Sequence, residues 1–448
     1  MLSDRVYSTL NLFFAIIGYQ FATCLAMPIY GGDIMGATNK VTIPYRLFTM
    51  LLATIVIVRS FILQKNLTFN LNRTIKLLTF FWALWILRLF YDLEIRFDFD
   101  ILPDETSRVW MYVFLLCLYS AFSIAVSFDK IDLHLAFRLT AFAITICLLI
   151  SLIYNPLLLA NTEEIMMRVD GNAALGTIAF GQMGLTAIII GACMMRTEHH
   201  TFLKYIIPVF LISVGSLITL RAGSRGPLLS LCCVVAFVII TSNKKPLLGF
   251  FLAFLFISFL NFFLRDIIMM IANVAPVLAE RLINTSSDDG RTILYQEAIK
   301  SFLQHPFFGD RFAIIYSDKT FIYSHNMILD AFMGTGILGG IIFIAMYVSV
   351  IMDGYKLIKS DRKKYMWIVL ILIQQMAAGM TSSAFYLKPI LTILIIFLAL
   401  SSIDDRLKKK TIKKKCAHCT DSRYPCNREL VRMHQPRDKD YRYSSYKQ

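Results

Sequence analysis

The sequence predicts an all-α integral membrane protein with about twelve transmembrane helices. Of its 448 residues, 57% are hydrophobic and only 17% are charged, and the mean hydropathy is +0.62. Soluble domains have about 25% charged residues, so most of this chain is too apolar for water. The apolar residues come in runs long enough for helices that cross about 30 Å of hydrocarbon. Transmembrane β-strands would instead alternate in polarity over about ten residues, and that alternation is not found.

Twelve apolar runs are predicted to span the membrane. They lie at residues 9–30, 46–64, 77–91, 109–127, 135–155, 174–195, 205–220, 227–241, 246–264, 327–351, 366–384 and 389–403. We therefore expect a transmembrane domain over residues 1–403, with one long loop, residues 265–326, between the ninth and tenth helices. A basic tail, residues 404–448, follows it.

The distribution of lysine and arginine predicts the orientation of the chain, because these residues favour cytoplasmic loops. If every run crosses, four loops and the tail place their basic residues on one side: Lys65, Arg73, Lys76, Arg196, Lys204, Lys244, Lys245, Lys356, Lys359, Arg362, Lys363, Lys364, Arg406, Lys408, Lys409, Lys410, Lys413, Lys414 and Lys415. Both termini are then cytoplasmic, and the long loop lies outside. We interpret the net charge of +15 as a topology signal that also attracts anionic lipid. No soluble domain for nucleic-acid binding is evident.

The nine cysteines do not predict a metal site or another cofactor. Six lie in predicted spans, where a thiol packs as a small hydrophobe: Cys24, Cys117, Cys147, Cys193, Cys232 and Cys233. The tail holds Cys416, Cys419 and Cys426, which form one C-x-x-C without a second pair at zinc-finger spacing. We expect this polar, basic tail to be disordered, and a small zinc module is the alternative.

Several arginines are predicted on the outer side, against the usual insertion bias. Arg168 precedes the sixth span, and Arg221 and Arg225 flank a very short connection that also contains Gly223 and Gly226. A bound anion would offset the cost of these charges, since guanidinium groups bind phosphate bidentately and stay protonated. The glycines would let backbone N–H groups approach it. The alternative is a structural network with carboxylates such as Asp170, Asp288 and Asp289.

The long outer loop contains one predicted helix. Residues 292–303 have apolar side chains at helical spacing after an acidic start, and His305-Pro306 ends the pattern. An amphipathic helix of this kind is expected to lie on the membrane surface, above a cavity. Arg291 in its first turn could point into that cavity, and a capping or surface role is the alternative.

His325 stands between the outer loop and the tenth span, in Ser324-His325-Asn326. An imidazole, with an ordinary pKa of about 6.5, can exchange a proton near neutral pH. The nearby Gly336 and Gly339 would allow close backbone contact. Packing in the core is the alternative for a single histidine, and His305 is interpreted in that structural way.

Three elements occur in a fixed order on the predicted outer face. They are Ser224-Arg225-Gly226 at the start of a span, Gly290-Arg291 followed by a helix and Pro306-x-x-Gly309, and His325-Asn326 followed by Gly336-x-x-Gly339. In this combination the chain resembles the O-antigen ligase and O-antigen polymerase superfamily, whose His-Asn/Ser/Gln-x9-Gly-x-x-Gly pattern it matches in full. The resemblance covers mainly residues 160–345.

The resemblance implies a metal-independent membrane glycosyltransferase of the GT-C type. Such an enzyme uses undecaprenyl-diphosphate-linked saccharides at the periplasmic face of the bacterial inner membrane, among membrane lipids, and a chain-length regulator is a further partner. His325 is then the catalytic histidine, and Arg225 binds the diphosphate. Arg168 and Arg291 match by position only, and Arg221 is an additional candidate. The supporting residues are Ser224, Gly226, Asn326, Gly336 and Gly339.

The motifs leave the acceptor open. A polymerase adds repeat units to a second lipid-linked saccharide, whereas a ligase transfers the finished chain to lipid A-core. We favour a polymerase of O-antigen, capsule or exopolysaccharide, because that branch is the more numerous and diverse. A transporter or flippase is the more distant alternative, since Arg59, Arg88 and Arg138 lie within predicted spans. No repeat between the two halves of the sequence supports it.

Overall fold

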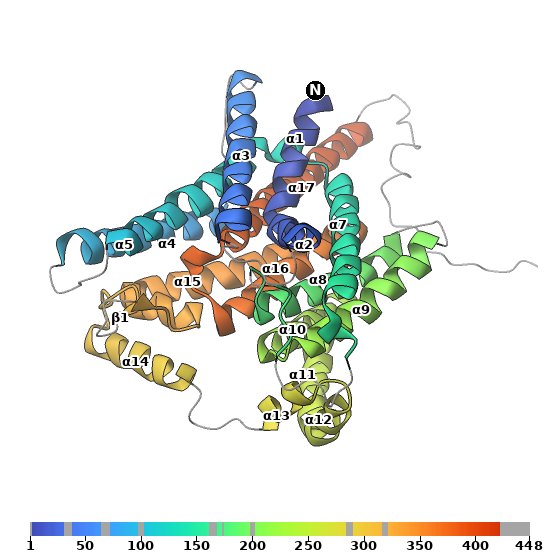
Figure 1. Ribbon diagram of the computed structural model, residues 1–448. Helices are drawn as coiled ribbons and strands as arrows, with labels where there is room; N and C mark the ends of the chain where they lie inside the picture. Colours follow the sequence, from blue (N-terminus) through green and yellow to red (C-terminus); the bar gives the residue numbers. More distant parts are fainter. Residues whose placement is uncertain are drawn as a thin grey trace, which may run out of the picture. The chain divides into compact units, whose positions relative to one another are not determined.

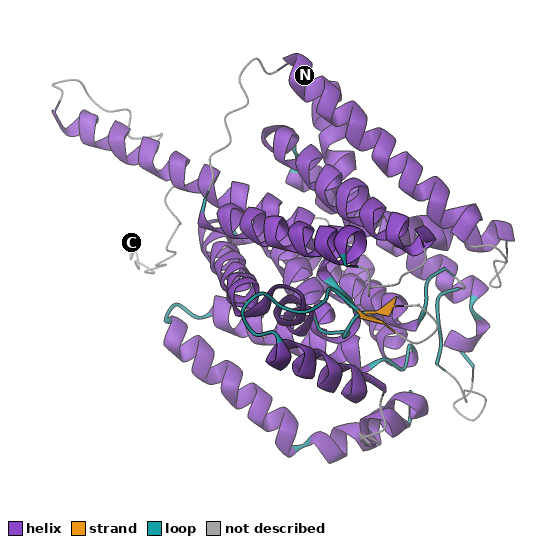
Figure 2. Ribbon diagram, turned by 90° about the vertical axis from the view of Figure 1, so that its left-hand side faces the viewer, coloured by secondary structure: helices purple, strands orange, loops and turns teal. Residues whose placement is uncertain are grey.

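The computed structural model describes residues 2–30, 38–63, 72–96, 103–160, 168–172, 174–197, 202–283, 290–315 and 321–421. Within these ranges the chain is almost entirely helical, apart from one two-stranded hairpin (Figures 1 and 2). The chain divides by its contacts into two units, Met1–Ser402 and Ile403–Gln448. The all-α fold predicted from hydropathy is confirmed.

The helices of the N-terminal half are α1 (Leu2–Phe13), η1 (Phe14–Gly18), α2 (Tyr19–Tyr30), η2 (Thr38–Thr42), α3 (Ile43–Leu63), α4 (Arg73–Phe90), η3 (Tyr91–Ile95), α5 (Pro103–Trp110), η4 (Met111–Tyr119), α6 (Ser120–Ser127), η5 (Phe128–Lys130), α7 (Leu133–Tyr154), η6 (Pro156–Leu158) and α8 (Thr177–Thr197). The remaining elements are η8 (Phe202–Ile206), α9 (Ile207–Arg221), α10 (Arg225–Ser242), α11 (Pro246–Phe262), α12 (Leu264–Ala272), α13 (Pro276–Ile283), α14 (Gly290–Gln304), β1 (Ile314–Ile315), β2 (Phe321–Ile322), α15 (Met327–Ser360), α16 (Arg362–Ser382), η9 (Phe385–Leu387) and α17 (Pro389–Asp421).

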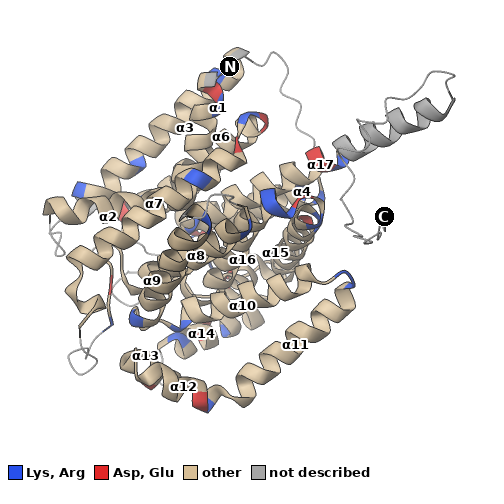
Figure 3. Cartoon of the chain, turned by 90° about the vertical axis from the view of Figure 1, so that its right-hand side faces the viewer, with Lys and Arg blue, Asp and Glu red and all other residues tan. Residues whose placement is uncertain are grey.

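Among the described residues, ten helical segments are long and apolar enough to cross a membrane, and the pair α11–α12, bent by 62°, makes an eleventh. The first eleven predicted runs fall on these segments. The twelfth run, residues 389–403, forms the beginning of α17, where Asp404, Asp405 and Arg406 follow the apolar residues too soon for a full span. Among the described residues, ten or eleven segments therefore meet the length and hydropathy requirements of a span, close to the predicted number of about twelve. Charged residues lie mostly near helix ends (Figure 3), as expected for helices in hydrocarbon.

Helix α16 forms the centre of the bundle, because 83% of its most apolar stretch is buried. It packs against α8, α10 and α15. Its buried Gln374 donates to the carbonyl and amide oxygens of Gln182, at 2.8 and 2.9 Å, and exchanges a hydrogen bond with Thr186. These bonds offset the cost of burying amides in an apolar interior. They hold α16 in place, and the end of this helix packs on Gly226 and Met327.

The long loop contains more structure than the sequence predicts. Besides the expected amphipathic helix, now α14, it holds α12, α13 and the hairpin in which Ile314 pairs with Ile322 (Figure 1). Helix α14 turns Leu294 and Ala298 toward Met333 of α15 and leaves Ile293 and Leu303 exposed. Apolar residues on both sides suit a helix with protein on one face and lipid on the other.

Helix α17 continues into the predicted tail and ends at Asp421. Its lysine-rich sequence consists of good helix formers that extend the last apolar helix. Residues 422–448, including Cys426, lie outside the described residues. The six cysteines predicted in spans are free thiols, and four of them are fully buried.

Candidate active site

His325 has an unusual backbone conformation. Its φ is +62°, and it is the one non-glycine residue with positive φ in the described parts of the chain. For an L-residue this left-handed region is crowded, and such a residue costs about 1–3 kcal/mol unless its surroundings fix it. Residues in this state gather at functional sites, so the backbone singles out the histidine that the sequence motif predicts.

The neighbours of His325 hold this turn on both sides. The buried Ser324 hydroxyl donates to the Asn326 carbonyl at 3.0 Å and accepts from the Asn326 N–H at 3.2 Å. The Asn326 side chain caps α15 by accepting from the N–H groups of Ile328 and Leu329, at 3.0 and 3.3 Å. The Asp330 carboxylate accepts from the Ser324 N–H at 2.9 Å. The motif residue Asn326 thus fixes the helix start directly after the histidine.

The imidazole of His325 is partly buried and poised to exchange a proton. Its Nδ1 is shielded from solvent and has no hydrogen-bond partner among the described residues. The Tyr323 ring packs edge-to-face on it, with centroids 4.5 Å apart. Burial and the positive charge of Arg291 lower the pKa of His325 below its ordinary value. The ring is therefore neutral at pH 7 and can accept a proton.

Three arginines from separate segments meet near this histidine: Arg168, Arg281 and Arg291. Burial lowers the pKa of Arg168, and the positive charges of Arg281 and Arg291 lower it further, partly opposed by Asp170. Arg168 donates to the Thr177 hydroxyl, but its buried Nε has no hydrogen-bond partner in the described structure. Like charges held together raise the free energy of the empty site, and a bound anion would lower it.

Gly223 makes room for this cluster. It adopts a φ of +60°, and a Cβ placed on it would lie 3.1 Å from Cγ of Arg168. Its carbonyl accepts from Arg281 Nη1 at 3.0 Å. Gly223 therefore joins the segment of Arg168 to α13.

Arg225 is the first residue of α10, where the helix dipole adds partial positive charge. Its N-cap, Ser224, is buried, and a Cβ placed on Gly226 would lie 3.1 Å from Oγ1 of Thr381, at the end of α16. Arg221 has a different setting. Its Nη1 donates to the carbonyls of Ala160 and Leu157, at 3.0 and 3.5 Å, beside η6, and its described contacts do not include the other arginines. Asp288 and Asp289, the alternative partners, lie outside the described residues.

The two glycines after His325 have distinct structural roles. Gly336 breaks α15, with φ +66° and ψ −163°, and a Cβ there would lie 2.3 Å from the carbonyl oxygen of Phe307. The Ile337 N–H donates to the Pro306 carbonyl at 2.7 Å. At Gly339 a Cβ would overlap the Thr335 hydroxyl. The motifs Pro306-x-x-Gly309 and Gly336-x-x-Gly339 therefore pack directly on each other.

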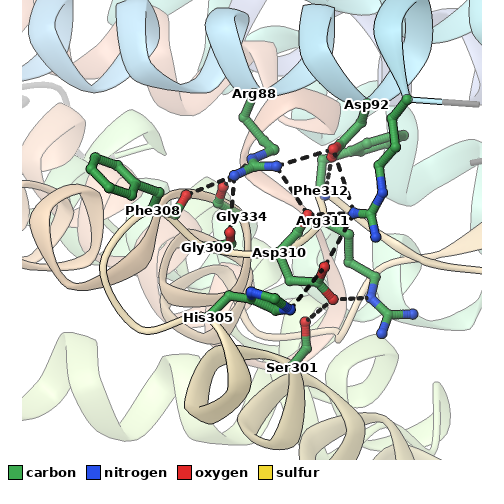
Figure 4. A network of polar contacts seen from close by, with 11 residues as sticks. Arg88, Asp92, Ser301, His305, Phe308, Gly309, Asp310, Arg311, Phe312 and Gly334 are labelled. Carbon is green, nitrogen blue, oxygen red and sulfur yellow. Dashed lines mark hydrogen bonds and ion pairs between the residues drawn. The ribbon is translucent and has the colours of Figure 1, made fainter.

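Arg88, from α4, fastens this junction (Figure 4). Its guanidinium donates to four backbone carbonyls, those of Gly334 (2.8 Å), Phe308 (2.8 Å), Gly309 (3.0 Å) and Asp310 (2.9 Å). Its Nη1 also contacts the buried Asp92 carboxylate at 3.1 Å, and Asp92 accepts from the Phe312 N–H at 2.9 Å. The short helix 327–335 that follows His325 is thereby capped at its far end.

Asp310 connects the same junction to α14. It accepts from Ser301 at 2.9 Å, from Arg311 at 2.7 Å and from Arg96 at 3.1 Å (Figure 4). Burial acts to raise the pKa of Asp310, but the bonds from Arg311 and Ser301 outweigh it and hold the pKa below the ordinary value. His305 Nε2 lies 3.9 Å from this carboxylate, a position in keeping with the structural role expected for it.

Sequence reasoning missed several residues of this site: Tyr323, Asp330, Arg281, Asp310 and Arg88. The first two flank the motif, and an acid four residues after a cap in an apolar run was a usable signal. Arg88 and Asp92 form an i,i+4 pair at the end of a span, which predicts an ion pair but not its backbone partners. In the described part of the chain, no three His, Cys, Asp or Glu side chains are placed to hold a metal ion.

The geometry defines a multi-pass membrane protein with a histidine and an arginine cluster at one end of the bundle. Residues 208–344 match the family model described as O-antigen ligase. The match includes Arg225, Arg291, His325 and both glycine motifs, and Arg168 precedes it. This part of the chain is therefore similar to the O-antigen ligase family, which confirms the resemblance predicted from the sequence motifs. No curated protein matches the sequence.

Proposed function

We propose that the protein is a glycosyltransferase that polymerises undecaprenyl-diphosphate-linked oligosaccharide repeat units at the periplasmic face of the inner membrane, with both termini cytoplasmic. The observation that carries this proposal is His325, held at positive φ beside a cluster of arginines. Its neutral imidazole supports a role as general base. The arginines support recognition of a diphosphate.

The reaction can be written with these groups alone. A sugar hydroxyl of the acceptor attacks the anomeric carbon of the donor and gives its proton to His325. The bond between that carbon and the phosphate oxygen breaks, and its electron pair leaves with the diphosphate. Arg168, Arg225 and Arg291 stabilise the developing charge in a site shielded from water. His325 then releases the proton to solvent. No step needs a metal ion.

Several observations favour an enzyme over a transporter. The polar groups of the site lie at one end of the bundle, in loops and helix starts, whereas transporters bind their cargo near the middle of the membrane. These groups include a proton acceptor, His325, and several arginines, and transfer of a glycosyl group from a diphosphate requires both kinds of residue. A ligase would use the same groups and differ only in its acceptor, lipid A-core.

The test is transfer by purified protein in nanodiscs with an undecaprenyl-diphosphate repeat-unit donor. We expect wild-type protein to form a ladder of polymer and His325→Ala to lose at least about 100-fold in rate, the usual contribution of a general base. His134→Ala, an exposed histidine at the start of α7, is the matched control and should retain activity. Product formed only when lipid A-core is supplied would assign a ligase. Normal polymer from His325→Ala would refute the catalytic role.

A further inference from the structure

A cavity of about 390 Å³ lies between the N-terminal helices and the ends of α16 and α17. Helices α1, α2, α3 and η4 form its other walls, and its lining includes Tyr19, Tyr45, Tyr112, Arg46 and Gln375. The volume is within the range of about 300–1,000 Å³ for small-molecule sites. None of the residues assigned to the proton acceptor or to the arginine cluster lines it.

The cavity adjoins the candidate active site on two sides. Gln375 in its wall lies one helical turn before Gly379 of α16, and a Cβ on Gly379 would lie 2.6 Å from Sδ of Met327, two residues after His325. On the other side, the Tyr19 hydroxyl donates to the Ala174 carbonyl at 3.0 Å, in the segment that begins with Arg168. These contacts join the cavity wall to the segments that carry His325 and Arg168.

A third connection runs through the turn between α16 and α17. Leu387 lines the cavity, and its neighbour Tyr386 packs on Phe312 with ring centroids 6.2 Å apart. Phe312 in turn packs on Phe321, with centroids 5.5 Å apart, at the start of the strand that leads to Tyr323. Edge-to-face contacts of Tyr386, Phe312 and Phe321 thus connect the cavity wall to the turn that holds His325.

Two groups in the cavity wall are placed to hydrogen-bond a ligand. The Gln375 side chain is only 8% exposed, and its amide has no hydrogen-bond partner among the described residues. Arg46 lies within the candidate span Lys40–Ile62, where it donates to the Tyr112 hydroxyl and its guanidinium carbon is 4.7 Å from the ring centre. A buried amide needs a hydrogen-bond partner, and a guanidinium near the end of a span offers several donors. Their presence indicates a site for a polar molecule.

The lining favours a sugar over an anionic lipid headgroup. Arg46 is the one cation in the lining, and it already contacts Tyr112. The other polar groups are hydroxyls and amides, from Asn11, Gln20, Thr49, Ser120 and Gln375 in addition to the tyrosines. Groups that both donate and accept match a polyol, and flat aromatic faces suit the apolar side of a sugar ring. A phosphate would instead call for several donors and cations.

We propose that this cavity binds the sugar of the acceptor, in a site whose wall packs on the segment that carries His325. The inference rests on the proposed function, because an acceptor exists only if the protein transfers a glycosyl group. Gln375 and Arg46 would hydrogen-bond the sugar hydroxyls, and Tyr19, Tyr45 and Tyr112 would surround the ring. The diphosphate of the donor remains with Arg168, Arg225 and Arg291.

The test separates binding from turnover. A repeat-unit oligosaccharide released from the organism's own polysaccharide is joined to a radiolabelled octyl chain, and its binding to protein in nanodiscs is measured in the His325→Ala background. We expect Gln375→Leu and Arg46→Met each to weaken binding about tenfold, whereas Arg59→Met, at the other end of α3 and bonded to Asp4, retains it. Tyr112→Phe, which removes one hydroxyl, replaces any variant that fails to accumulate.

Each outcome decides the question. Unchanged binding in Gln375→Leu and Arg46→Met would overturn the cavity assignment, as would displacement of the probe by phosphatidylglycerol but not by unlabelled oligosaccharide. With His325 present, the two variants should raise KM for the acceptor about tenfold and leave KM for the donor nearly unchanged. Saccharide binding that depends on Gln375, in a protein that transfers no sugar, would refute the proposed function and leave the cavity as a saccharide site.

Discussion

Two clusters of charged side chains lie at the same end of this helical bundle, and they differ in how completely their hydrogen-bonding groups are used. Around Arg88, the guanidinium contacts four carbonyls and one carboxylate (Figure 4). Around Arg168 and His325, Nε of the arginine and Nδ1 of the histidine are buried without a partner in the described structure. Because buried polar groups are normally satisfied, the first cluster is complete in itself, whereas the second suits the anion of the proposed function.

The comparison separates two reasons for placing arginine in an apolar protein. Arg88 makes a structural junction between α4, the turn at Gly309 and the helix that follows His325. Arg168 is held against two like charges, Arg281 and Arg291, an arrangement that weakens the empty protein and strengthens binding of an anion. Substitutions in the first cluster should therefore change folding, and those in the second should change transfer.

The largest effect is expected at Arg88. Arg88→Met removes a donor from four carbonyls and a charged partner from the buried Asp92, and breaking a buried charged contact costs about 3–5 kcal/mol. The thermal midpoint and the amount of protein in the membrane should both fall. Arg73→Met, at the opposite end of α4, is the control, and it should retain the wild-type midpoint. An unchanged thermal midpoint for Arg88→Met would mean that the Arg88 cluster does not stabilise the fold.

Arg168 provides the opposite case. Arg168→Ala should accumulate normally but lose about 30- to 1000-fold in transfer rate, corresponding to about 2–4 kcal/mol of transition-state stabilisation. Arg168→Lys should recover only part of the rate, because a point charge replaces a planar fork. Initial rates with the purified lipid-linked donor test this. If Arg168→Ala lowers the thermal midpoint and leaves the transfer rate unchanged, Arg168 has a structural role like that of Arg88.

The same assay tests the metal-free chemistry. Transfer by wild-type protein should continue in EDTA, because the arginines alone neutralise the leaving diphosphate in the proposed mechanism. Restoration of activity by an added divalent cation, after loss in EDTA, would show that the arginine clamp is incomplete.

The sequence predicts the helices of this protein well, because a run of apolar residues near 20 in length has few alternatives in a membrane. It also predicts Arg225 and His325, since their neighbours form a recognisable pattern. It does not predict the partners of Arg88, because backbone carbonyls of Phe308 and Gly334 carry no side-chain signature. In the same way, α12 and α13 were expected as loop, since short amphipathic helices lack both a long apolar run and clear caps.

A smaller effect is expected at Asn326. Asn326→Ala removes the cap from the N–H groups of Ile328 and Leu329, at a cost of about 0.5–2 kcal/mol. Since this cap follows His325 directly, the turn should loosen, and transfer should fall several-fold while the protein still accumulates. Asn326→Ser, which can still cap the helix, should recover most of the rate. Equal rates for the alanine and serine variants would show that capping does not position the histidine.

The smallest effect is expected in the pH dependence of the transfer rate, which reports how Arg291 acts on the pKa of His325. Burial and the charge of Arg291 lower the pKa of His325, so the neutral base is the major form at pH 7. The transfer rate should therefore be level above pH 7 and fall as the pH drops through the lowered pKa, below about 6.5. In Arg291→Gln one cation is absent, so the pKa should rise and the acid limb of the rate profile should move to higher pH. Arg311→Gln, whose charge is paired with Asp310, is the control and should leave the limb in place. A limb that stays fixed in Arg291→Gln would mean that Arg291 does not act on the base, even if the overall rate falls.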